Sequence, residues 1–261
     1  APPGELRVVD DIQSALEVPE EVSEAARNLA LQLFGDDLTE CEKFVNNLLQ
    51  VYSQAAGRDF LLIFNSGGLG GNEIGPEWGS ILDGIEEELG KLGYTTLLAI
   101  YVRTADGLWD IFNEIRETIH SYPTKTRPLA YEIDFLTEHL ESINVILMGE
   151  SSGGIFSNEV MKLLDANPRV YSIQTGIPFA YHSLVSDRSL VINDNGIIPD
   201  TLTRCDLWAI FRANLGRVPT YRPEEGHLFF YIRAPGHIYT WDHPGVRSQI
   251  TSFLREHFAS E

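Results

Sequence analysis

Apolar residues along the chain fall into two kinds of segment, short runs that are apolar throughout and longer stretches with apolar residues three or four positions apart. The short runs predict strands that are covered on both faces, and the longer stretches predict amphipathic helices. The predicted strands cover residues 59–65, 94–102, 144–149, 169–176, 188–194 and 227–234. The predicted helices cover residues 14–34, 38–57, 76–93, 106–120, 129–142, 155–167, 201–216 and 244–258.

The order of these segments predicts the fold class. Apolar strands that alternate with helices indicate an α/β protein, with a mostly parallel central sheet and helices on both faces. Residues 1–58 are acidic and mostly helical in pattern, so we expect an N-terminal helical extension packed on a main domain of residues 59–261.

The composition agrees with a folded domain that needs no cross-links. The chain has 261 residues, of which 43% are hydrophobic, enough to build a sizeable core. Its two cysteines, Cys41 and Cys205, lie far apart in the sequence. Two such cysteines are more often small buried residues than a disulfide, and we expect that here.

The net negative charge of the chain disfavours some classes of binding partner. A formal charge of -19 repels phosphate backbones and anionic lipid surfaces, so we expect no nucleic-acid partner. No apolar run reaches about 18 residues, so no membrane span is expected. The sequence assigns no oligomeric state and no compartment, although a soluble, cytoplasmic protein is favoured.

One strand-to-helix junction carries the strongest chemical signal. The stretch "NVILMGESSGGIFSNEV" places Ser151 between Gly149 and Gly153, in the pattern G-x-S-x-G of a nucleophile elbow. A turn this tight strains the backbone of the serine, and a side chain two positions before or after it would collide with neighbouring elements. Ligands of open α/β sheets lie beyond the carboxyl ends of the strands, where Ser151 is expected. Ser151 is therefore the predicted nucleophile, and Ser152 is its natural rival.

A general base should follow later in the chain. His237 comes after the predicted strand 227–234 and a turn, and before the last helix, so it should lie at the same sheet edge as Ser151. His243 stands beside Pro244 at the helix start, where a capping or packing role is more typical. His237 is the predicted base.

The third group should be a carboxylate beyond a late strand, because it must orient the imidazole and stabilise its charge. Asp194 directly follows the predicted strand 188–194 and is the expected acid. Asp200 and Asp206 remain competitors, and an Asx turn that ends the strand is the structural alternative for Asp194.

The oxyanion of an acyl-transfer intermediate needs two backbone N–H donors. Ser152 follows the nucleophile and is expected to supply one. The glycine-rich stretch "FNSGGLGGNE" after the first strong strand should supply the other, from Gly68 or Leu69. Apolar candidates for the substrate pocket are Leu69, Trp78, Trp109, Phe179 and Tyr181, although the aromatic ones are equally compatible with core or surface positions.

With Ser151, Asp194 and His237 in that order, the chain resembles the α/β-hydrolase superfamily of serine esterases and lipases over residues 59–258. The segments that carry the resemblance are "GESSGG" and "PGHIYTWDHPGVRSQITSFL", together with the strand and glycine loop near residue 60. The resemblance implies a Ser-His-Asp triad, the oxyanion donors Gly68 and Ser152, and carboxylic ester hydrolysis with no cofactor and no metal. The partner that it implies is a small-molecule ester substrate. The chain departs from the family at Ser66, where a histidine is usual.

Two further expectations concern access and the competing functions. Only about ten residues separate the predicted strands 169–176 and 188–194, too few for a large helical lid. The alternatives to an esterase are a non-catalytic binding or scaffold protein on the same fold, and an acyl transferase or thioesterase that uses the same groups.

Overall fold

A computed structural model describes residues 4–9, 17–67, 74–103, 125–181, 186–215 and 233–259 of the chain. Its described strands form one sheet in the order β1-β3-β2-β4-β5-β6, in which only β1 runs antiparallel to its neighbour. The strands are β1 (Glu5–Val8), β2 (Phe60–Asn65), β3 (Thr96–Val102), β4 (Asn144–Glu150), β5 (Val170–Thr175) and β6 (Ser189–Ile192).

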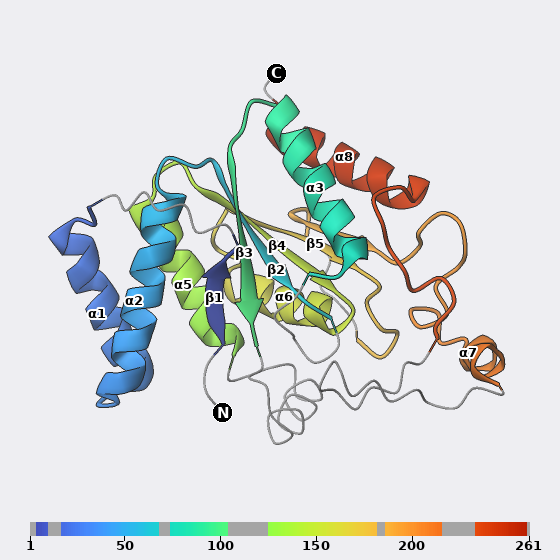
Figure 1. The fold of residues 1–261 in the computed structure, drawn as a ribbon, viewed down its shortest axis with the longest axis horizontal. Coiled ribbons are helices and arrows are strands. Elements are labelled where there is room, and N and C mark those ends of the chain that lie inside the picture. Colours follow the sequence, from blue (N-terminus) through green and yellow to red (C-terminus); the bar gives the residue numbers. More distant parts are fainter. Residues whose placement is uncertain are drawn as a thin grey trace.

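Helices cover both faces of this sheet (Figure 1). They are α1 (Glu20–Phe34), α2 (Leu38–Ala55), α3 (Pro76–Lys91), α5 (Thr126–His139), α6 (Ser152–Leu163), α7 (Leu207–Asn214) and α8 (Pro244–Phe258). The helices α5 and α6 pack on one face, where α1 and α2 extend the layer, and α3 and α8 pack together on the other face.

The central strands show why both faces are covered. On β2, Leu61 and Ile63 are buried in the core under α5 and α6, whereas Phe60, Leu62 and Phe64 are buried in the core under α3 and α8. Successive side chains of a strand point to opposite faces, so a strand apolar at every position needs two cores. The predicted α/β class, with its mostly parallel sheet, is confirmed.

The N-terminal part contains a strand that the sequence analysis missed. Residues 1–58 were expected to be mostly helical, yet β1 pairs with β3, and Leu6 of β1 is fully buried opposite Tyr101. The helix predicted over residues 14–34 begins at Glu20 in α1. The helices α1 and α2 share a core with the sheet, and Cys41 of α2 is buried in it. Cys41 and Cys205 are both free, and Cys205 is exposed, so the expectation of buried cysteines holds for Cys41 alone.

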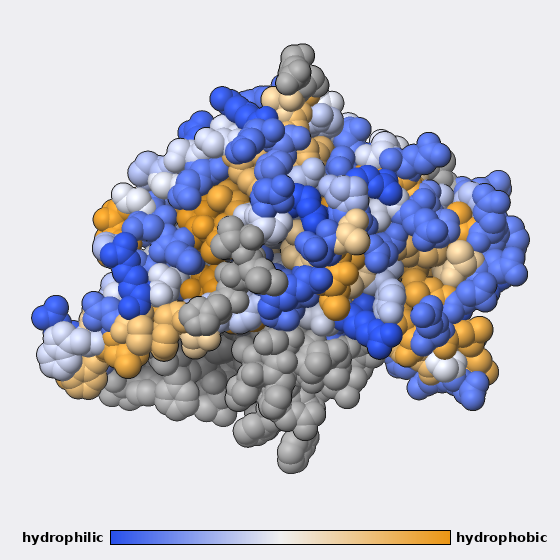
Figure 2. All heavy atoms as spheres, turned by 180° about the vertical axis from the view of Figure 1, so that it is seen from behind, coloured by the Kyte–Doolittle hydropathy of each residue, from blue (hydrophilic) through white to orange (hydrophobic). Residues whose placement is uncertain are grey.

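The helix predicted over residues 201–216 is shorter than expected. Cys205 adopts a left-handed conformation with φ of 59°, which ends the preceding turns, and the carboxylate of Asp206 then caps α7 by accepting from the amide of Ala209. None of the residues of α7 is buried, and Trp208 and Phe211 are exposed. Figure 2 shows apolar side chains on this projecting end of the molecule, at the lower left.

Some predicted elements lie outside the described residues, namely the helix 106–120 and nearly all of the strand 227–234. Within the described ranges, no helix is both long and apolar enough to cross a bilayer.

Helix α5 buries a carboxyl group in the core. Glu132 is 2% exposed, and its Oε2 atom has no hydrogen-bond partner among the described residues. Burial, with a smaller contribution from the charge of Glu5, raises the pKa of Glu132 to about 8. The native protein therefore holds this proton more tightly than the unfolded chain does.

This difference in proton affinity predicts a stability that falls with rising pH. The contribution of Glu132 is complete below the ordinary glutamate pKa and is lost as pH rises toward about 8, by about 1.4 kcal/mol for each pH unit in that window. We expect Glu132→Gln to remove this dependence on pH. The unfolding free energy of the variant minus that of the parent should therefore increase from pH 5 to pH 9. Urea titrations across this range measure it. The exposed Glu138 of the same helix provides the control, since Glu138→Gln should keep the slope of the parent.

Candidate active site

Ser151 lies at the junction of β4 and α6 in a strained conformation. Its φ of 52° and ψ of -115° are values that residues with a side chain rarely adopt. Its amide donates to the carbonyl of Thr175 at 2.9 Å, and its carbonyl accepts from the amide of Ile155 at 3.1 Å. Such strain costs on the order of 1–3 kcal/mol and persists where the surroundings enforce it, commonly at functional sites.

The two flanking glycines are required by close backbone approach. A Cβ atom on Gly149 would lie 2.4 Å from the carbonyl carbon of Gly153. A Cβ atom on Gly153 would lie 2.0 Å from the carbonyl oxygen of Asn65, at the end of β2. The glycines thus allow the strand, the turn and the helix to pack closely enough to present Ser151 at the sheet edge.

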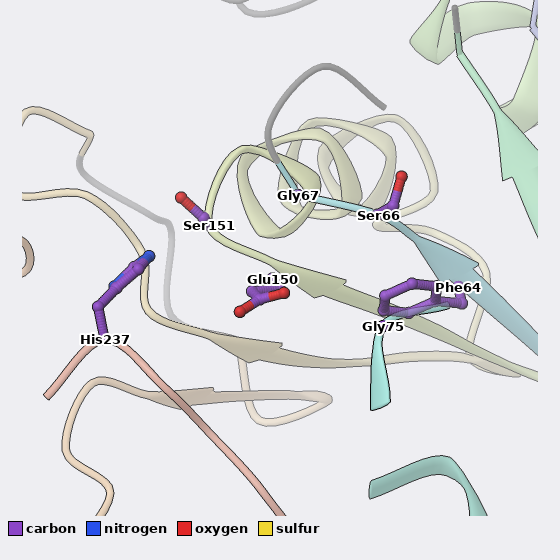
Figure 3. Close-up of a pocket in the computed structure, with 7 residues that line it drawn as sticks. All are labelled: Phe64, Ser66, Gly67, Gly75, Glu150, Ser151 and His237. Atoms are coloured by element: carbon purple, nitrogen blue, oxygen red, sulfur yellow. The ribbon is translucent and has the colours of Figure 1, made fainter. Parts of the chain in front are cut away.

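His237 is brought to the same place by the loop that precedes α8. Ser151 and His237 both line a pocket of about 360 Å³, and Figure 3 shows the imidazole directed toward the turn that carries Ser151. The two side chains share no direct hydrogen bond in the described structure, and catalytic contacts are often long before substrate binds. His243, the other candidate, lies at the N-cap of α8, and its Nδ1 accepts from the amide of Thr240.

The carboxylate that contacts His237 is Asp200, and the expectation that Asp194 would do so is wrong. Asp200 Oδ2 lies 2.8 Å from His237 Nδ1, and the Asp200 side chain is completely buried. Asp194 instead accepts from the amide of Gly196 at 2.8 Å and from Arg204 at 3.0 Å, with 49% of its side chain exposed. It is therefore a turn-forming residue after β6, which is the structural alternative for that position. Asp206, the third candidate, caps α7.

Asp200 is surrounded by hydrogen-bond donors on both carboxylate oxygens. Oδ1 accepts from the amides of Leu202 at 2.8 Å and Thr203 at 3.2 Å, and Oδ2 accepts from Tyr239 at 2.6 Å as well as contacting His237. Burial raises the pKa of this carboxyl, but the hydrogen bonds from His237 and Tyr239 outweigh it and hold the pKa below its usual value. Asp200 is thus kept ionised beside the imidazole.

Tyr239 is a partner of the site that the sequence analysis missed. It is completely buried, and burial together with the adjacent Asp200 carboxylate raises the pKa of its phenol, which therefore stays protonated and donates to Asp200. The sequence offered only its position two residues after His237, where an extended segment places both side chains on the same side.

We expect Tyr239→Phe to raise the pKa of Asp200, since a donor to its ionised form is lost. A carboxyl with a depressed pKa stabilises the fold above its ordinary value, and that contribution disappears as pH falls through the folded value. The midpoint of acid unfolding should therefore move to higher pH, with a loss at neutral pH of about 1.5–3 kcal/mol, typical of a hydrogen bond to a charged group. Circular dichroism during acid titration measures the midpoint. An unchanged midpoint would show that Asp200 does not depend on this donor.

Asn195 joins the loop that leads to Asp200 to the loop that carries His237. Its Nδ2 donates to the carbonyls of Gly236 at 3.3 Å and Ile238 at 3.0 Å, on either side of His237. Its Oδ1 accepts from the amides of Ile197 at 2.9 Å and Ile198 at 3.0 Å, in its own loop. This buried side chain therefore fixes the path that returns the chain to Asp200.

The pocket is built at the carboxyl ends of the central strands. Its lining consists of Phe64, Ser66, Gly67, Gly75, Glu150, Ser151 and His237. Figure 3 shows the carboxylate of Glu150 between His237 and Phe64. Burial raises the pKa of Glu150, the charge of His237 opposes this, and the charge of Glu77 adds to it. The described part of the chain contains no group of three or more His, Cys, Asp or Glu side chains that could hold a metal ion.

The remaining predicted site residues differ in whether the structure describes them. Gly68, Leu69 and Trp109 lie outside the described residues. Ser152 is the first residue of α6, directly beside Ser151.

Three aromatic candidates do not line the pocket. Trp78 is a core residue, 1% exposed, with its ring centroid 5.0 Å from that of Phe64, so its predicted place at the substrate is not supported. Phe179 is exposed and does not line the pocket. Tyr181 contacts Asn158 and Lys162 on α6.

Comparisons with known proteins find similarity in structure only. No family model matches the chain, and no curated protein matches its sequence. Among solved structures, 36 chains match. One of them is a Trichoderma reesei cutinase in complex with a phosphonate inhibitor, 13% identical, with a TM-score of 0.47 over 94% of this chain and 94% of the cutinase chain. The parallel strands β2 to β6, the helices on both faces and the strained serine turn after β4 form an open α/β fold with a strand-to-helix turn of the nucleophile-elbow type.

Proposed function

We propose that this protein is a serine hydrolase that cleaves carboxylic esters through an acyl-enzyme on Ser151. The single observation that carries the proposal is the contact of the buried Asp200 with the partly buried His237, 2.8 Å apart, beside a pocket that the strained Ser151 also lines. A serine, an imidazole and a carboxylate on three separate elements have no structural need to meet at one sheet edge, whereas acyl transfer requires all three.

Each group has a distinct role in the proposed reaction. Asp200 accepts from Nδ1 of His237, which leaves Nε2 as the nitrogen with a free lone pair. Nε2 removes the proton of the Ser151 hydroxyl as its oxygen attacks the ester carbonyl, and backbone amides stabilise the resulting oxyanion. His237 then returns the proton to the leaving alcohol, and the acyl group stays on Ser151.

Hydrolysis of the acyl-enzyme repeats these steps with water. His237 removes a proton from a water molecule, which attacks the acyl carbonyl, and the second tetrahedral intermediate collapses to release the carboxylic acid. The proton returns from His237 to Ser151, so the enzyme ends unchanged. The proposed oxyanion donors include the amide of Ser152, which directly follows Ser151 at the start of α6, where the helix dipole also favours negative charge.

The experiment that tests this function is labelling with a fluorophosphonate probe, combined with hydrolysis of aryl esters of increasing acyl length. The proposal expects the protein to be labelled on Ser151 and to release the aryl alcohol. A well-folded protein that neither reacts with the probe nor hydrolyses any ester would be a binding protein on a hydrolase fold. An added alcohol or amine that outcompetes water for the acyl group would identify an acyl transferase.

A further inference from the structure

A buried arginine contacts the loop that leads from β2 into the pocket. Arg103 directly follows β3 and is 2% exposed. Its Nη2 donates to the carbonyl oxygen of Ser66 at 2.6 Å, and its guanidinium lies 5.2 Å from the centre of the Phe156 ring. Ser66 and the next residue, Gly67, both line the pocket with Ser151. A charged side chain thus ends on the backbone of the proposed active site.

Because the peptide bond is planar, the contact with the Ser66 carbonyl also sets the direction of the Gly67 N–H group. The described part of the chain has no cis peptide bond, and in a trans peptide the C=O and the following N–H point in opposite directions. An arginine that holds the carbonyl of Ser66 on one side therefore fixes the direction of the Gly67 amide on the other. Figure 3 shows Gly67 between Ser66 and Ser151.

The charge of the guanidinium strengthens this donor as well as orienting it. A charge-assisted hydrogen bond to the carbonyl polarises the whole peptide, so its N–H becomes more positive. This effect is largest where water is excluded, as it is around Arg103. A neutral side chain of the same length would provide the packing without the polarisation.

The preceding residue is anchored from the side of the nucleophile. Asn65 Nδ2 donates to the carbonyl of Met148 at 3.3 Å and to the hydroxyl of Ser157 at 2.9 Å, on β4 and α6 respectively. The end of β2 is therefore tied to the elements that carry Ser151, and the Ser66–Gly67 peptide is held between this anchor and Arg103.

We propose that Arg103 is a positioning residue that builds the oxyanion hole. It holds the Ser66 carbonyl so that the Gly67 amide, in place of the Gly68 or Leu69 amide expected from the sequence, joins the amide of Ser152 in donating to the oxyanion that forms when Ser151 attacks. This inference rests on the proposed hydrolase function, and it assigns to a side chain outside the triad a role in stabilising the transition state.

The test compares two substitutions of Arg103 on an aryl ester that the native enzyme hydrolyses. Arg103→Met should lower kcat by about 10²–10³, the usual effect of losing one oxyanion donor, with KM changed less than about threefold. Arg103→Lys keeps a charge but not the planar guanidinium, so its loss should be about tenfold. A trifluoromethyl ketone, whose adduct with serine carries an oxyanion, should lose affinity in parallel with kcat.

Arg169 offers a chemically matched control. It also donates from a partly buried guanidinium to backbone carbonyls, those of Leu140 at 2.9 Å and Glu141 at 3.0 Å, but at the opposite end of the sheet. Arg169→Met should lower the melting temperature and leave kcat of the folded protein unchanged. If Arg103→Met does not fold, Arg103→Lys carries the test through kcat and the ketone affinity.

The outcomes separate this inference from the proposed function. An active native enzyme whose Arg103 variants keep native kcat and native ketone affinity would overturn the role of Arg103 and leave the hydrolase intact. Native protein that fails to hydrolyse esters or to react with the fluorophosphonate would overturn the function itself.

Discussion

Ser151→Ala is expected to lower kcat on an aryl ester by on the order of 10⁵–10⁶, because it removes the oxygen that we propose forms the acyl-enzyme. Substrate binding should change little, since the hydroxyl is a small part of the pocket lining. Initial rates measured with an active-site titration exclude traces of native enzyme. The variant should also fail to react with a fluorophosphonate. Retention of labelling, or of more than about 1% of the activity, would place the nucleophile elsewhere. Ser152 would then be the next candidate for the nucleophile.

The strained backbone of Ser151 provides a companion to this measurement. Alanine keeps a Cβ and therefore keeps the strain at φ of 52°, whereas glycine reaches this region freely. Ser151→Gly should therefore be more stable than Ser151→Ala by about 1 kcal/mol, against the usual order of these residues. Urea unfolding of the two inactive variants compares them directly. Equal stability, or a more stable alanine variant, would show that the turn holds no strain that glycine can release.

Asp200→Asn is expected to lower kcat by about 10⁴, the effect of replacing a triad carboxylate by an amide. The two oxygens of Asp200 accept from four groups, two on each side. An amide must turn its NH₂ group either toward the backbone donors or toward His237 and Tyr239. Facing His237, it stabilises the tautomer with hydrogen on Nε2, which cannot accept the serine proton. Steady-state kinetics with a circular dichroism check of folding measures the effect.

The matched control is Asp194→Asn, on the acid that the sequence favoured. Asp194 makes an exposed ion pair with Arg204, and such pairs contribute less than about 1 kcal/mol. Its substitution should leave kcat within about threefold of the native value. A large loss at Asp194 with native activity at Asp200 would reverse the assignment and would require the loop to adopt a different path with substrate bound.

The sequence predicted those parts of the structure that local pattern controls. Strands that are apolar at every position, such as β2, are recognisable because two-sided burial leaves no polar face. The turn at Ser151 is recognisable because Gly149 and Gly153 are close-approach positions within five residues of sequence. β1 escaped detection because four residues at a sheet edge carry too short a pattern.

The carboxylate that contacts His237 was mispredicted because its identity depends on contacts distant in sequence. Asp194 and Asp200 both follow β6, and either could reach a histidine. The loop returns to place Asp200 at His237 because Asn195 is bonded to backbone carbonyls more than forty positions later, at Gly236 and Ile238. No periodicity in the chain reports such a pairing. For the same reason the hydrogen bond from Tyr239 to Asp200 could not be predicted from the sequence.

The link through Asn195 predicts that Ser151 and the Asp200–His237 pair differ in their resistance to local unfolding. Ser151 follows a central strand of the sheet, whereas Asp200 and His237 lie on two loops outside it that are joined to each other through Asn195 and Thr201. Loops open locally at lower free energy than core strands. Moderate heating would therefore detach acid and base together while the nucleophile stays in place, so that inactivation precedes melting and reverses on cooling.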